Sequence, residues 1–593
     1  MDAGHLAVRF AESASAHASR PATRIAAGGG WTVHSYAELS ADVRRLAAAL
    51  IASGLAAGDR VAIFSTNRPE WTLADLACAT AGLVSVPLYA TSTSEQARHI
   101  LADSGCRLAF VEGAEELAKL ADVRADLPAL ERVVSFEDAS PDAASLAAEL
   151  AAAPDDQTQV DARLATASAA DLATIIYTSG TTGEPKGVML NHRGFTHQID
   201  VLSRSFAFAD TDVSLCFLPL SHALERAWTY VVLSSGALNT YVPDPRTVAE
   251  AMVSVRPNLM VSVPRLYEKV FLAAKEKVAG SPVKQRLMTW ALRVGSEFHT
   301  AVREGRPRSS SLIVRFKLAD KLVLSSVREA IGGPKKVLAC GGAPLRPEIQ
   351  EFFESCGLLL LSGYGLTEAS PLVSFPSPSA YRTGTVGRVV GGGEVHLADG
   401  DEICYRGPNV MLGYWGRPDD TAAVLVDGWL HTGDVGHLDA DGFLTITDRI
   451  KDLIVTSNGK NVAPATIEGL LAADPLFEYT LLLGDNRPYL TLLVAPSLPH
   501  LEDIGRQLQL TWAHRDELLA HPAILDELRR RAGELTAKLA KHEQIRDLRL
   551  LVEEFTQENG LLTPTLKVKR KEVEQRFAQL VEDMYAKAGK GRK

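Results

Sequence analysis

Residues 174–187 read TIIYTSGTTGEPKG, and this stretch decides which folds the chain can adopt. An apolar, strand-like run leads into a loop of Ser, Thr and Gly that ends in Pro-Lys-Gly. Glycines let backbone amides converge on an anion, hydroxyl groups add donors, and Lys186 adds a compact positive charge. The pattern predicts a phosphate-binding loop directly after a buried strand, with a flexible surface loop as the plainer alternative.

The loop differs from other nucleotide-binding signatures. Pro185 stands five residues after Gly180, where a Walker A loop has Gly, and no Ser or Thr follows Lys186. The run GGGEV at 391–395 leads into strand-like sequence, so it does not fit a Rossmann fingerprint. We also find no GxSxG nucleophile elbow. A P-loop NTPase is therefore disfavoured.

Upstream of the loop, short β-branched runs alternate with amphipathic segments. This alternation indicates βαβ units and a largely parallel sheet. The expected strands are 60–65, 84–89 and 108–111, and the expected helices are 68–81 and 94–102, the latter capped by Ser94. The Ala/Asp-rich stretch 137–170 is expected to form one surface helix and a linker.

Downstream of the loop, a second α/β block extends from Asp171 to about Pro376. Short strands punctuated by Gly then predict a small antiparallel sheet or barrel over 384–448. The tail mixes strands with a helix near 523–542, in which Ile524, Leu528, Leu535 and Leu539 share one face. The expected tail strands are 479–483, 489–494 and 548–552.

Composition restricts the class of protein. The 593 residues suffice for roughly three to five structural units. With 46% apolar and 23% charged residues, the chain is neither disordered nor collagen-like nor a coiled coil as a whole. The net charge of −10 argues against nucleic acid as a partner.

The cysteines and the termini bear on the cellular compartment. Six widely spaced cysteines without a CxxC pair argue against a zinc site or a disulfide framework and fit a reducing cytosol. The first residues show no apolar secretory segment, and the uncharged stretch 227–243 is a poor membrane span. The expected location is cytoplasmic.

Six further motifs follow the phosphate loop in order. They are LPLSHALER (218–226), CGGAPL (340–345), GYGLTEASP (363–371), RGPNVMLGYW (406–415), WLHTGDVG (429–436) and DRIKDLIVTSNGKNVAP (448–464). Together with 177–187 this series resembles that of the adenylate-forming superfamily, which includes acyl-CoA synthetases, luciferases and peptide-synthetase adenylation domains. The resemblance spans nearly the whole chain and implies ATP-dependent activation of a carboxylate. It also implies a large N-terminal domain over 1–449 and a small mobile α+β domain over 450–593. The large domain divides into α/β subdomains at about 1–170 and 171–380 and a barrel at 381–448.

The resemblance assigns roles to individual residues. Activation brings one anion against another at the α-phosphate, so the site must neutralise charge and align the partners. Thr178 and Glu368 would hold Mg²⁺, and His222 would line the acyl carboxylate pocket. The residues implied to bind ATP or AMP are Thr178, Ser179, Gly180, Thr181, Thr182, Gly183, Lys186, Gly341, Gly342, Ala343, Tyr364, Gly365, Thr367, Asp434 and Arg449. A solvated acid at Glu368, a core Tyr364 and a core His222 stay open as alternatives.

The C-terminal segment LTPTLKVKRKEV (562–573) resembles the motif whose lysine reaches the adenylation site. Lys567 aligns with that lysine and Arg570 with the basic residue three positions further on. Leu566 replaces the commoner Gly, and Lys569 is a nearby competitor for the role. The family rotates its small domain between two half-reactions, which places the hinge at Lys451. The loop 457–461, with Gly459 and Lys460, would then line the path of CoA.

The acyl substrate is inferred from a basic segment. Residues 265–336 contain sixteen Lys or Arg and six Asp or Glu, a local charge of +10. This region resembles the long-chain fatty acyl-CoA synthetase branch, in which Tyr267 aligns with an aromatic gate to the acyl tunnel. A basic amphipathic surface would also attract anionic lipid on the inner face of the membrane. A solvated helical face that attracts the phosphates of CoA explains the same charges.

Three functions remain in competition on the sequence. The leading one is a long-chain fatty acid–CoA ligase that uses Mg²⁺ with ATP and then CoA. The second is an acyl-AMP ligase that loads a free-standing acyl carrier protein. The third is an inactive lipid-binding or scaffold protein, against which the intact Lys186, Glu368, Asp434, Arg449 and Lys567 argue. A monomer and a homodimer are both compatible with the sequence.

Overall fold

The structure is a computed structural model that describes residues 2–178, 185–557, 559–563 and 567–586. The chain forms two compact units. Unit 1 comprises Met1–His396, Cys404–Thr432 and Leu438–Thr445, and unit 2 comprises Leu397–Ile403, Gly433–His437 and Ile446–Lys593. No helix in the described part of the chain is both long and apolar enough to cross a membrane.

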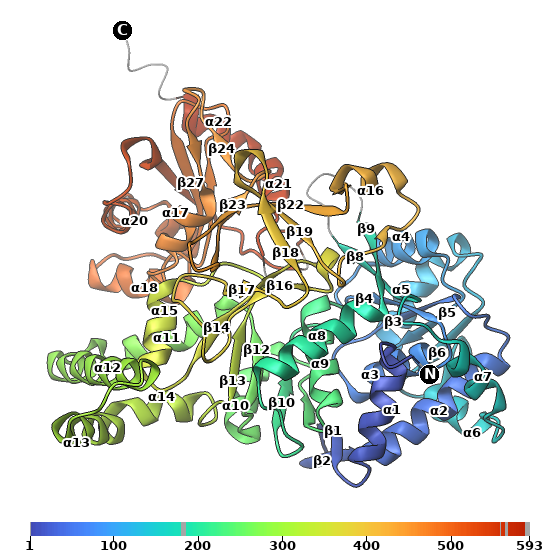
Figure 1. Cartoon of the computed structure of the whole chain (residues 1–593). Coiled ribbons are helices and arrows are strands. Elements are labelled where there is room, and N and C mark those ends of the chain that lie inside the picture. Colours follow the sequence, from blue (N-terminus) through green and yellow to red (C-terminus); the bar gives the residue numbers. More distant parts are fainter. Residues whose placement is uncertain (1, 179–184, 558, 564–566, 587–593) are drawn as a thin grey trace. The chain divides into compact units, whose positions relative to one another are not determined.

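Unit 1 contains an eight-stranded sheet in the order β20-β9-β8-β4-β3-β5-β6-β7 (Figure 1). Its strands are β3 (Arg60–Phe64), β4 (Val84–Leu88), β5 (Leu108–Val111), β6 (Arg132–Ser135), β7 (Ala144–Ser145), β8 (Leu172–Thr178), β9 (Lys186–Asn191) and β20 (Gly413–Tyr414). Strands β8, β4, β3, β5, β6 and β7 are parallel, whereas β9 returns antiparallel to β8. The predicted βαβ alternation is therefore confirmed.

Helices cover both faces of this sheet. Side chains of β3 alternate, so that Ala62 and Phe64 pack with α4 (Ser94–Ser104) and α5 (Ala114–Val123). Helices α2 (Tyr36–Ala52) and α3 (Pro69–Thr80) lie on the opposite face (Figure 1). The N-cap of α4 is Thr93 rather than the predicted Ser94, because Thr93 and Gln96 form a reciprocal capping box.

The stretch 137–170 differs from its prediction. It holds the edge strand β7 and two helices, α6 (Leu146–Ala152) and α7 (Thr158–Thr166), instead of one helix and a linker. Leu146, Val160 and Leu164 are buried. These few apolar side chains, spaced within an Ala/Asp-rich background, suffice to hold two short helices against α2.

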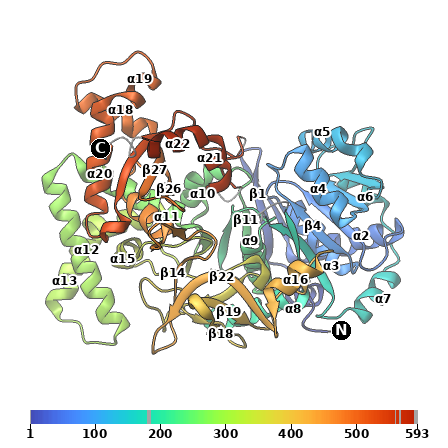
Figure 2. The ribbon, with the colours of Figure 1, turned by 90° about the horizontal axis from the view of Figure 1, so that it is seen from above.

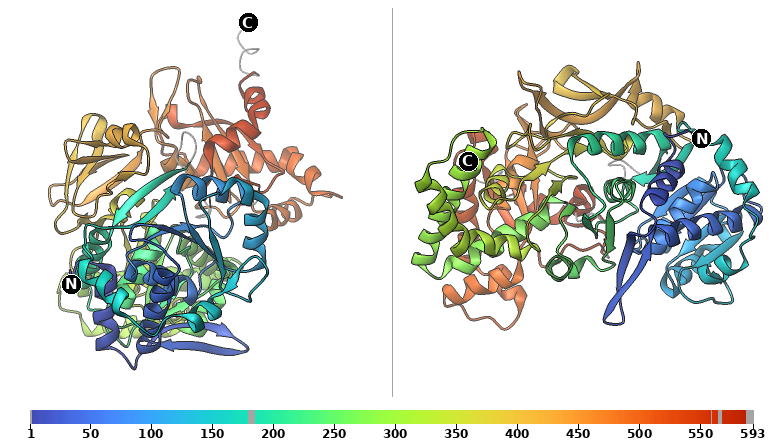
Figure 3. Two further views of the ribbon diagram at one scale, coloured as in Figure 1. Left: turned by 90° about the vertical axis from the view of Figure 1, so that its right-hand side faces the viewer. Right: turned by 60° about the horizontal axis from the view of Figure 1, so that its bottom comes forward.

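The second sheet of unit 1 has seven strands in the order β14-β13-β12-β10-β11-β1-β2. They are β1 (Pro21–Ala27), β2 (Gly30–Ser35), β10 (Val213–Cys216), β11 (Leu238–Tyr241), β12 (Leu259–Ser262), β13 (Val337–Cys340) and β14 (Leu360–Ser362). All neighbouring pairs are parallel except the β1–β2 hairpin. Figure 3 shows this hairpin in dark blue, extending from the sheet edge. Neither large sheet is built from one continuous stretch of chain.

A buried ion pair joins the two sheets. Arg226, on α9 (Ala223–Ser234), pairs with Asp75 on α3, and both side chains are 2% exposed. The same guanidinium donates to Thr174 of β8 at 2.7 Å and to Ser85 of β4 at 2.6 Å. Its Nε donates to the Tyr230 hydroxyl at 2.8 Å. Because α9 also packs on β10 and β11, this network links helices and strands from both sheets.

The remaining helices of unit 1 surround these sheets. They are α1 (Leu6–Ala16), α8 (His192–Ser205), α10 (Val248–Val255), α11 (Pro264–Ala279), α12 (Pro282–Arg303), α13 (Ser310–Ala319), α14 (Ser325–Ala330), α15 (Pro347–Ser355) and α16 (Pro418–Val424). Two smaller sheets are also present, one ordered β15-β16-β17 in unit 1 and one ordered β18-β19-β22-β21 with β23 beside β22; the residues of β18, β19, β22 and β23 are divided between the two units. Their strands are β15 (Tyr364–Gly365), β16 (Leu372–Phe375), β17 (Arg388–Val389), β18 (Glu394–Leu397), β19 (Glu402–Arg406), β21 (Leu425–Val426), β22 (Trp429–Leu438) and β23 (Leu444–Arg449).

Unit 2 is built on the sheet β26 (Tyr479–Leu483), β27 (Leu490–Ala495) and β28 (Ile545–Leu550). Alternate side chains of β27 face two cores, Leu492 and Val494 one and Leu493 and Ala495 the other. The first core is covered by α17 (Pro464–Leu471), α18 (Leu498–Gln507), α19 (Arg515–Ala520) and α20 (Pro522–Leu535); the second by α21 (Arg570–Arg576) and α22 (Ala578–Ala586). A two-stranded pair, β24 (Ile454–Val455) and β25 (Asn461–Val462), also belongs to this unit.

Helix α20 ends at Leu535, seven residues before the predicted end at 542. Ile524 and Leu528 are buried on it as expected, whereas Leu539 lies beyond the helix. The Gln544 side chain donates to the carbonyls of Thr536 and Leu539, both at 3.0 Å. This amide satisfies carbonyls in the irregular turn, so the chain folds back toward β28 while Leu539 still packs on the core.

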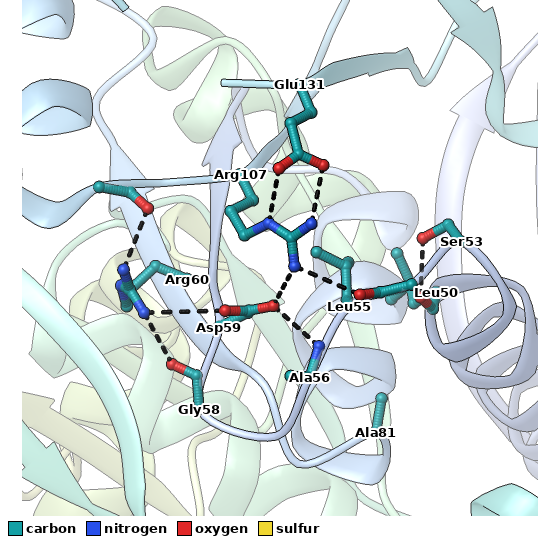
Figure 4. Close-up of polar contacts among 12 residues, drawn as sticks. Leu50, Ser53, Leu55, Ala56, Gly58, Asp59, Arg60, Ala81, Arg107 and Glu131 are labelled. Atoms are coloured by element: carbon teal, nitrogen blue, oxygen red, sulfur yellow. Dashed lines mark hydrogen bonds and ion pairs between the residues drawn. The ribbon is translucent and has the colours of Figure 1, made fainter. Parts of the chain in front are cut away.

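Charged side chains fix the loops at the amino ends of β3, β5 and β6. Figure 4 shows Arg107 between Glu131 and Asp59, with Asp59 also accepting from the Ala56 amide at 2.8 Å. Both nitrogens of the Arg107 fork donate to Glu131 at 2.8 Å. This cluster secures the edge of the sheet opposite the phosphate loop.

Two histidine rings in tilted contact are expected to make unit 1 sensitive to acid. The rings of His5 and His192 lie 3.6 Å apart between centroids, and burial lowers the pKa of both. The unfolded chain then binds more protons below about pH 6.5, so stability is lost as pH falls through that value. We expect the thermal midpoint to fall between pH 7 and pH 5, and less steeply in His192→Phe. The exposed His437→Gln should follow the wild type, and identical slopes in all three proteins would contradict the assignment.

Candidate active site

Several of the nucleotide and acyl residues predicted in unit 1 lie at the carboxyl edge of the seven-stranded sheet. His222 follows β10, Tyr267 follows β12, the Gly341–Ala343 turn follows β13, and Tyr364 follows β14. Parallel strands place the segments after their carboxyl ends along one edge, which is where α/β sheets bind ligands. Motifs that are more than 140 residues apart in the sequence therefore follow strands of the same sheet.

His222 is the N-cap of α9, and its Nδ1 accepts from the Leu224 amide at 3.2 Å. This acceptor role leaves Nε2 as the ring nitrogen that can carry a proton. The preceding Leu218–Leu220 backbone is held by Asn67, which donates to the Leu218 carbonyl at 2.6 Å and accepts from the Leu220 amide at 3.0 Å. Asn67 follows β3, and sequence reasoning missed it because no motif marks it.

The backbone of the proposed adenine site needs glycine at two points. Gly342 has a φ of +82°, a conformation that side chains rarely adopt. A Cβ at Gly365 would lie 1.9 Å from the Pro371 carbonyl oxygen. Tyr364, just before Gly365, is 8% exposed, and Thr367, two residues after it, is 7% exposed, so both side chains are buried in unit 1.

The buried strand predicted before the phosphate loop is β8, and β9 follows the loop. Thr178 and Lys186 are partners in the antiparallel register, so they face each other at the base of the loop. Ser179, Gly180, Thr181, Thr182 and Gly183 lie outside the described residues. The hydroxyl of Tyr177, one residue before Thr178, donates to Asp103 on α4 at 2.5 Å.

Lys186 belongs to a polar cluster whose other members come from distant motifs. Its ammonium pairs with Asp420 on α16 at 2.5 Å and lies 5.3 Å from the centre of the Tyr414 ring. The Tyr414 hydroxyl donates to Glu368 at 2.9 Å. Tyr414 therefore connects the lysine with the predicted metal-binding carboxylate. The motif at 406–415 contains Tyr414 without indicating a role for it, and Asp420 lies outside every motif.

The Tyr414 contact can be tested by one substitution. Tyr414→Phe removes the hydrogen bond to Glu368 and keeps the ring near Lys186. A hydrogen bond to a charged group contributes about 1.5–3 kcal/mol, so we expect kcat/KM for ATP to fall by about tenfold or more. The measurement is steady-state kinetics at saturating fatty acid. An unchanged value in a folded variant would remove Tyr414 from the site.

Tyr267 lies on α11 and is 1% exposed. Its hydroxyl donates to the Ala339 carbonyl at 2.7 Å, and its ring packs edge-on against Phe353 at 5.6 Å. The surrounding core includes Phe271 and Phe352. An acyl chain that enters here has to displace this aromatic packing.

In unit 2 the structure brings three predicted residues together. Arg449 donates from Nε to Asp434 at 2.8 Å, and the charges of both act on Lys567. Water reaches the Lys567 side chain, yet desolvation by its surroundings and the charge of Arg449 lower its pKa to about 8. Asp434 is buried at the carboxylate, whereas the Arg449 side chain is 52% exposed. Asp452 also acts electrostatically on Lys567.

The predicted hinge and CoA residues occupy turns of unit 2. Lys451 is exposed in the turn after β23, where the amides of Asp452 and Leu453 both donate to the Arg449 carbonyl. Gly459, with a φ of +70°, and Lys460 are exposed in the turn between β24 and β25. Arg570 does not join Lys567 at the surface but pairs with Glu468.

Comparison with known proteins decides the family. The model of the AMP-binding enzyme matches residues 10–415, and that of the AMP-binding enzyme C-terminal domain matches residues 451–589. The chain belongs to the AMP-binding enzymes. The resemblance inferred from the seven motifs is thereby confirmed.

Relatives extend over nearly the whole length of this AMP-binding enzyme. Long-chain-fatty-acid–CoA ligase FadD15 of Mycobacterium tuberculosis is 36% identical over 567 residues, covering 94% of this chain and 93% of the relative. Long chain acyl-CoA synthetase 6, peroxisomal, of Arabidopsis thaliana is 30% identical, covering 94% and 82%. These relatives support the acyl-CoA synthetase branch.

Solved structures confirm the fold class of this AMP-binding enzyme. The adenylation domain of carboxylic acid reductase from Segniliparus rugosus, in complex with AMP and a co-purified carboxylic acid, aligns with a TM-score of 0.76 at 23% identity. The alignment covers 98% of this chain and 94% of that one. Mycobacterium tuberculosis fatty acyl CoA synthetase aligns with a TM-score of 0.63 at 19% identity, covering 98% and 100%.

Proposed function

We propose that this chain is a long-chain fatty acid–CoA ligase that forms acyl-AMP from a fatty acid and ATP and transfers the acyl group to CoA. The observation that carries the proposal is the Lys186–Tyr414–Glu368 cluster beside the phosphate loop, which offers a cation and a carboxylate to one triphosphate. The curated relatives are named as ligases of this kind over 94% of the chain.

The two half-reactions use different groups. In the first, a carboxylate oxygen bonds to the α-phosphorus of ATP and the bond to the β-phosphate breaks, which releases pyrophosphate. Lys186 and Lys567 oppose the negative charge that builds up there, and Asp434 binds the ribose hydroxyls. In the second, the CoA sulfur bonds to the acyl carbon, the thiol proton passes to solvent and AMP leaves. Lys451 is the hinge between these poses, and the Gly459–Lys460 turn lines the path of CoA.

The donor set suits Mg²⁺ bound with ATP. A hydroxyl at Thr178 and a carboxylate at Glu368 are hard oxygen ligands, and the Tyr414 hydroxyl orients that carboxylate. When bound, the ion neutralises charge on the triphosphate. Glu368→Gln is therefore expected to weaken the use of Mg²⁺–ATP with little change in folding stability.

One assay separates the proposed function from its alternatives. AMP release is measured across saturated fatty acids of graded length, with and without CoA. A long-chain ligase releases AMP at rates that rise with chain length and depend on CoA. Turnover that needs a phosphopantetheinylated carrier protein instead of CoA would favour the acyl-AMP ligase. Absence of fatty-acid-dependent pyrophosphate release would favour the inactive lipid-binding protein.

The basic segment offers a surface for the lipid substrate. Helices α12 and α13 run side by side in unit 1 (Figure 2). Val314, Leu318 and Leu322 form a stripe at intervals of four residues and are 66%, 51% and 51% exposed. Lys317 and Lys321 flank the stripe, and neither has an ion-pair partner among the described residues. We propose that this stripe docks on an anionic membrane surface, with Tyr267 gating the acyl tunnel.

Neutralising the flanking lysines tests this surface. Each basic residue near an anionic membrane contributes about 1 kcal/mol, so Lys317→Gln/Lys321→Gln should weaken vesicle binding by roughly 30-fold at low salt. Cosedimentation with phosphatidylserine-containing vesicles measures the effect, which should fade as salt rises. Activity on a soluble medium-chain acid should persist. Equal binding to zwitterionic vesicles would contradict the proposal.

Arg303 also lies in the basic segment, but it is unsuitable for this test. It donates to Glu354 at 2.6 Å and to the Tyr381 hydroxyl at 3.0 Å. A charge reversal there would break contacts within unit 1. The matched control is therefore Arg246→Gln, which removes an exposed charge outside the basic segment.

A further inference from the structure

Unit 2 holds an ion pair to which the proposed reaction assigns no role. Arg570, at the start of α21, donates from Nη1 to both carboxylate oxygens of Glu468 on α17, at 2.8 and 3.0 Å. Its Nη2 donates to the Leu482 carbonyl at 2.7 Å, and the Leu482 amide donates to Glu468 at 2.6 Å. The two side chains are 22% and 20% exposed. The pair therefore ties α17, β26 and α21 at one point.

Arg570 follows Lys567 by three residues in the chain, and both side chains line the same depression of unit 2. The amide of Lys567 donates to the Thr563 hydroxyl at 3.0 Å, and the Thr563 amide donates to the Lys567 carbonyl at 2.8 Å. Val568 pairs with Leu562 as an antiparallel bridge, and the Lys569 amide donates to Leu561. Lys567 is thus at the end of a short paired segment, and Arg570 fixes the residue where that segment becomes a helix.

The surroundings favour a positioning role over direct phosphate binding. Lys567, Glu468, Arg570, Asp448 and Asp452 line one depression of unit 2. Both Arg570 Nη atoms donate to groups of unit 2, and its charge is matched by Glu468. Lys567 has no such partner carboxylate in hydrogen-bond contact within the described residues. Of these two cations, Lys567 is therefore the one whose charge can act on a substrate.

We propose that Glu468 and Arg570 are positioning residues for acyl-adenylate formation, because their ion pair sets the direction in which the Lys567 side chain leaves unit 2. The proposal rests on the proposed function, since it requires Lys567 to act in the first half-reaction. A displacement of about 1 Å at a catalytic group lowers the rate by up to roughly 100-fold. The ion pair can therefore change the rate through the position of Lys567, without touching the substrate.

The test is Arg570→Lys in the full-length enzyme. Lysine keeps the charge and loses the two-pronged contact with Glu468. We expect kcat for fatty-acid-dependent ATP–pyrophosphate exchange to fall by about tenfold or more, with KM for ATP unchanged and thioester formation from supplied acyl-AMP unchanged. Arg576→Lys is the matched control, because Arg576 lies on the same helix in an exposed pair with Glu553. It should leave all three values unchanged.

Three results would overturn the proposal. They are an equal loss in both half-reactions, a rise in KM for ATP at constant kcat, and unchanged exchange in the folded variant. Should Arg570→Lys fail to fold, Glu468→Asp provides the same comparison. The rate at which an amine-reactive reagent modifies Lys567, read by mass spectrometry, reports its placement without turnover. A changed rate supports the proposal, and an unchanged rate opposes it. Lack of exchange in the wild type would instead refute the proposed function.

Discussion

Replacing Lys567 by alanine should lower the rate of acyl-adenylate formation by roughly 10²- to 10³-fold, the usual effect of removing one charge-stabilising donor. Thioester formation from supplied acyl-AMP should persist, because the negative charge at the α-phosphate builds up only in the first half-reaction. The backbone contacts of Lys567 with Thr563 do not require its side chain, so the paired segment should remain. ATP–pyrophosphate exchange and CoA consumption measure the two steps separately.

Lys569→Ala is the matched control for this result. Lys569 lies two residues away in the same basic run and should leave exchange unchanged. An equal loss in both half-reactions would mean that Lys567 acts in folding. A loss in Lys569→Ala instead would transfer the role to that residue.

We also expect the rate of adenylation to depend on pH through Lys567. Desolvation and Arg449 lower the pKa of Lys567 to about 8, so the ammonium form is complete only below that pH. Because the charged form stabilises the phosphate, adenylation should decline as pH rises through about 8. Lys567→Arg, which keeps its charge at higher pH, should retain a flatter profile. The same decline in Lys567→Arg would show that another group titrates.

The second large effect concerns stability. Arg226→Met should destabilise unit 1 by about 3–5 kcal/mol, because Asp75 would be left as an unpaired charge 2% exposed to solvent. The variant also removes the hydrogen bonds that the hydroxyls of Thr174 and Ser85 accept from the guanidinium, although both hydroxyls keep the bonds that they donate to backbone carbonyls. Scanning calorimetry of the full chain measures the loss as a lower unfolding temperature of unit 1.

A double variant separates the charge from the packing. Asp75→Leu/Arg226→Met removes both members, so it should recover part of the lost stability. Arg246→Met, at a side chain 91% exposed, is the matched control and should change stability by no more than about 0.5 kcal/mol. If Arg226→Met were as stable as the double variant, the loss would not come from the unpaired charge of Asp75.

The sequence predicts the elements of unit 1 well where local signals agree. The strand at 108–111 and the helix after Pro69 are found as expected, because an apolar run or a proline marks each. The capping residue of α4 is misplaced by one position, since Thr93 and Ser94 are both good caps and only the contact with Gln96 decides between them. The end of α20 is missed because Gln544 acts from outside the helix.

The candidate site is predictable only in part, for a related reason. The ordered motifs predict Lys186, Glu368 and Asp434, because each of these residues lies within a recognisable segment of sequence. Asp420 contacts Lys186 and Asn67 contacts Leu218, each more than 140 residues away in sequence, and no local pattern predicts these contacts. The pairing of Arg570 with Glu468 across 102 residues is of the same kind.

The interleaving of the two large sheets determines when the nascent chain can fold. β1 pairs with β2 on one side, but its other side has no partner until β11 has been synthesised, at residue 241. Likewise β4 has no neighbour on one side until β8 emerges at 172–178. Such long-range pairing slows folding and leaves strand edges open to wrong partners in the meantime. A fragment that stops near residue 170 would keep those edges permanently unpaired, which makes it a poor choice for expression and a natural substrate for chaperones.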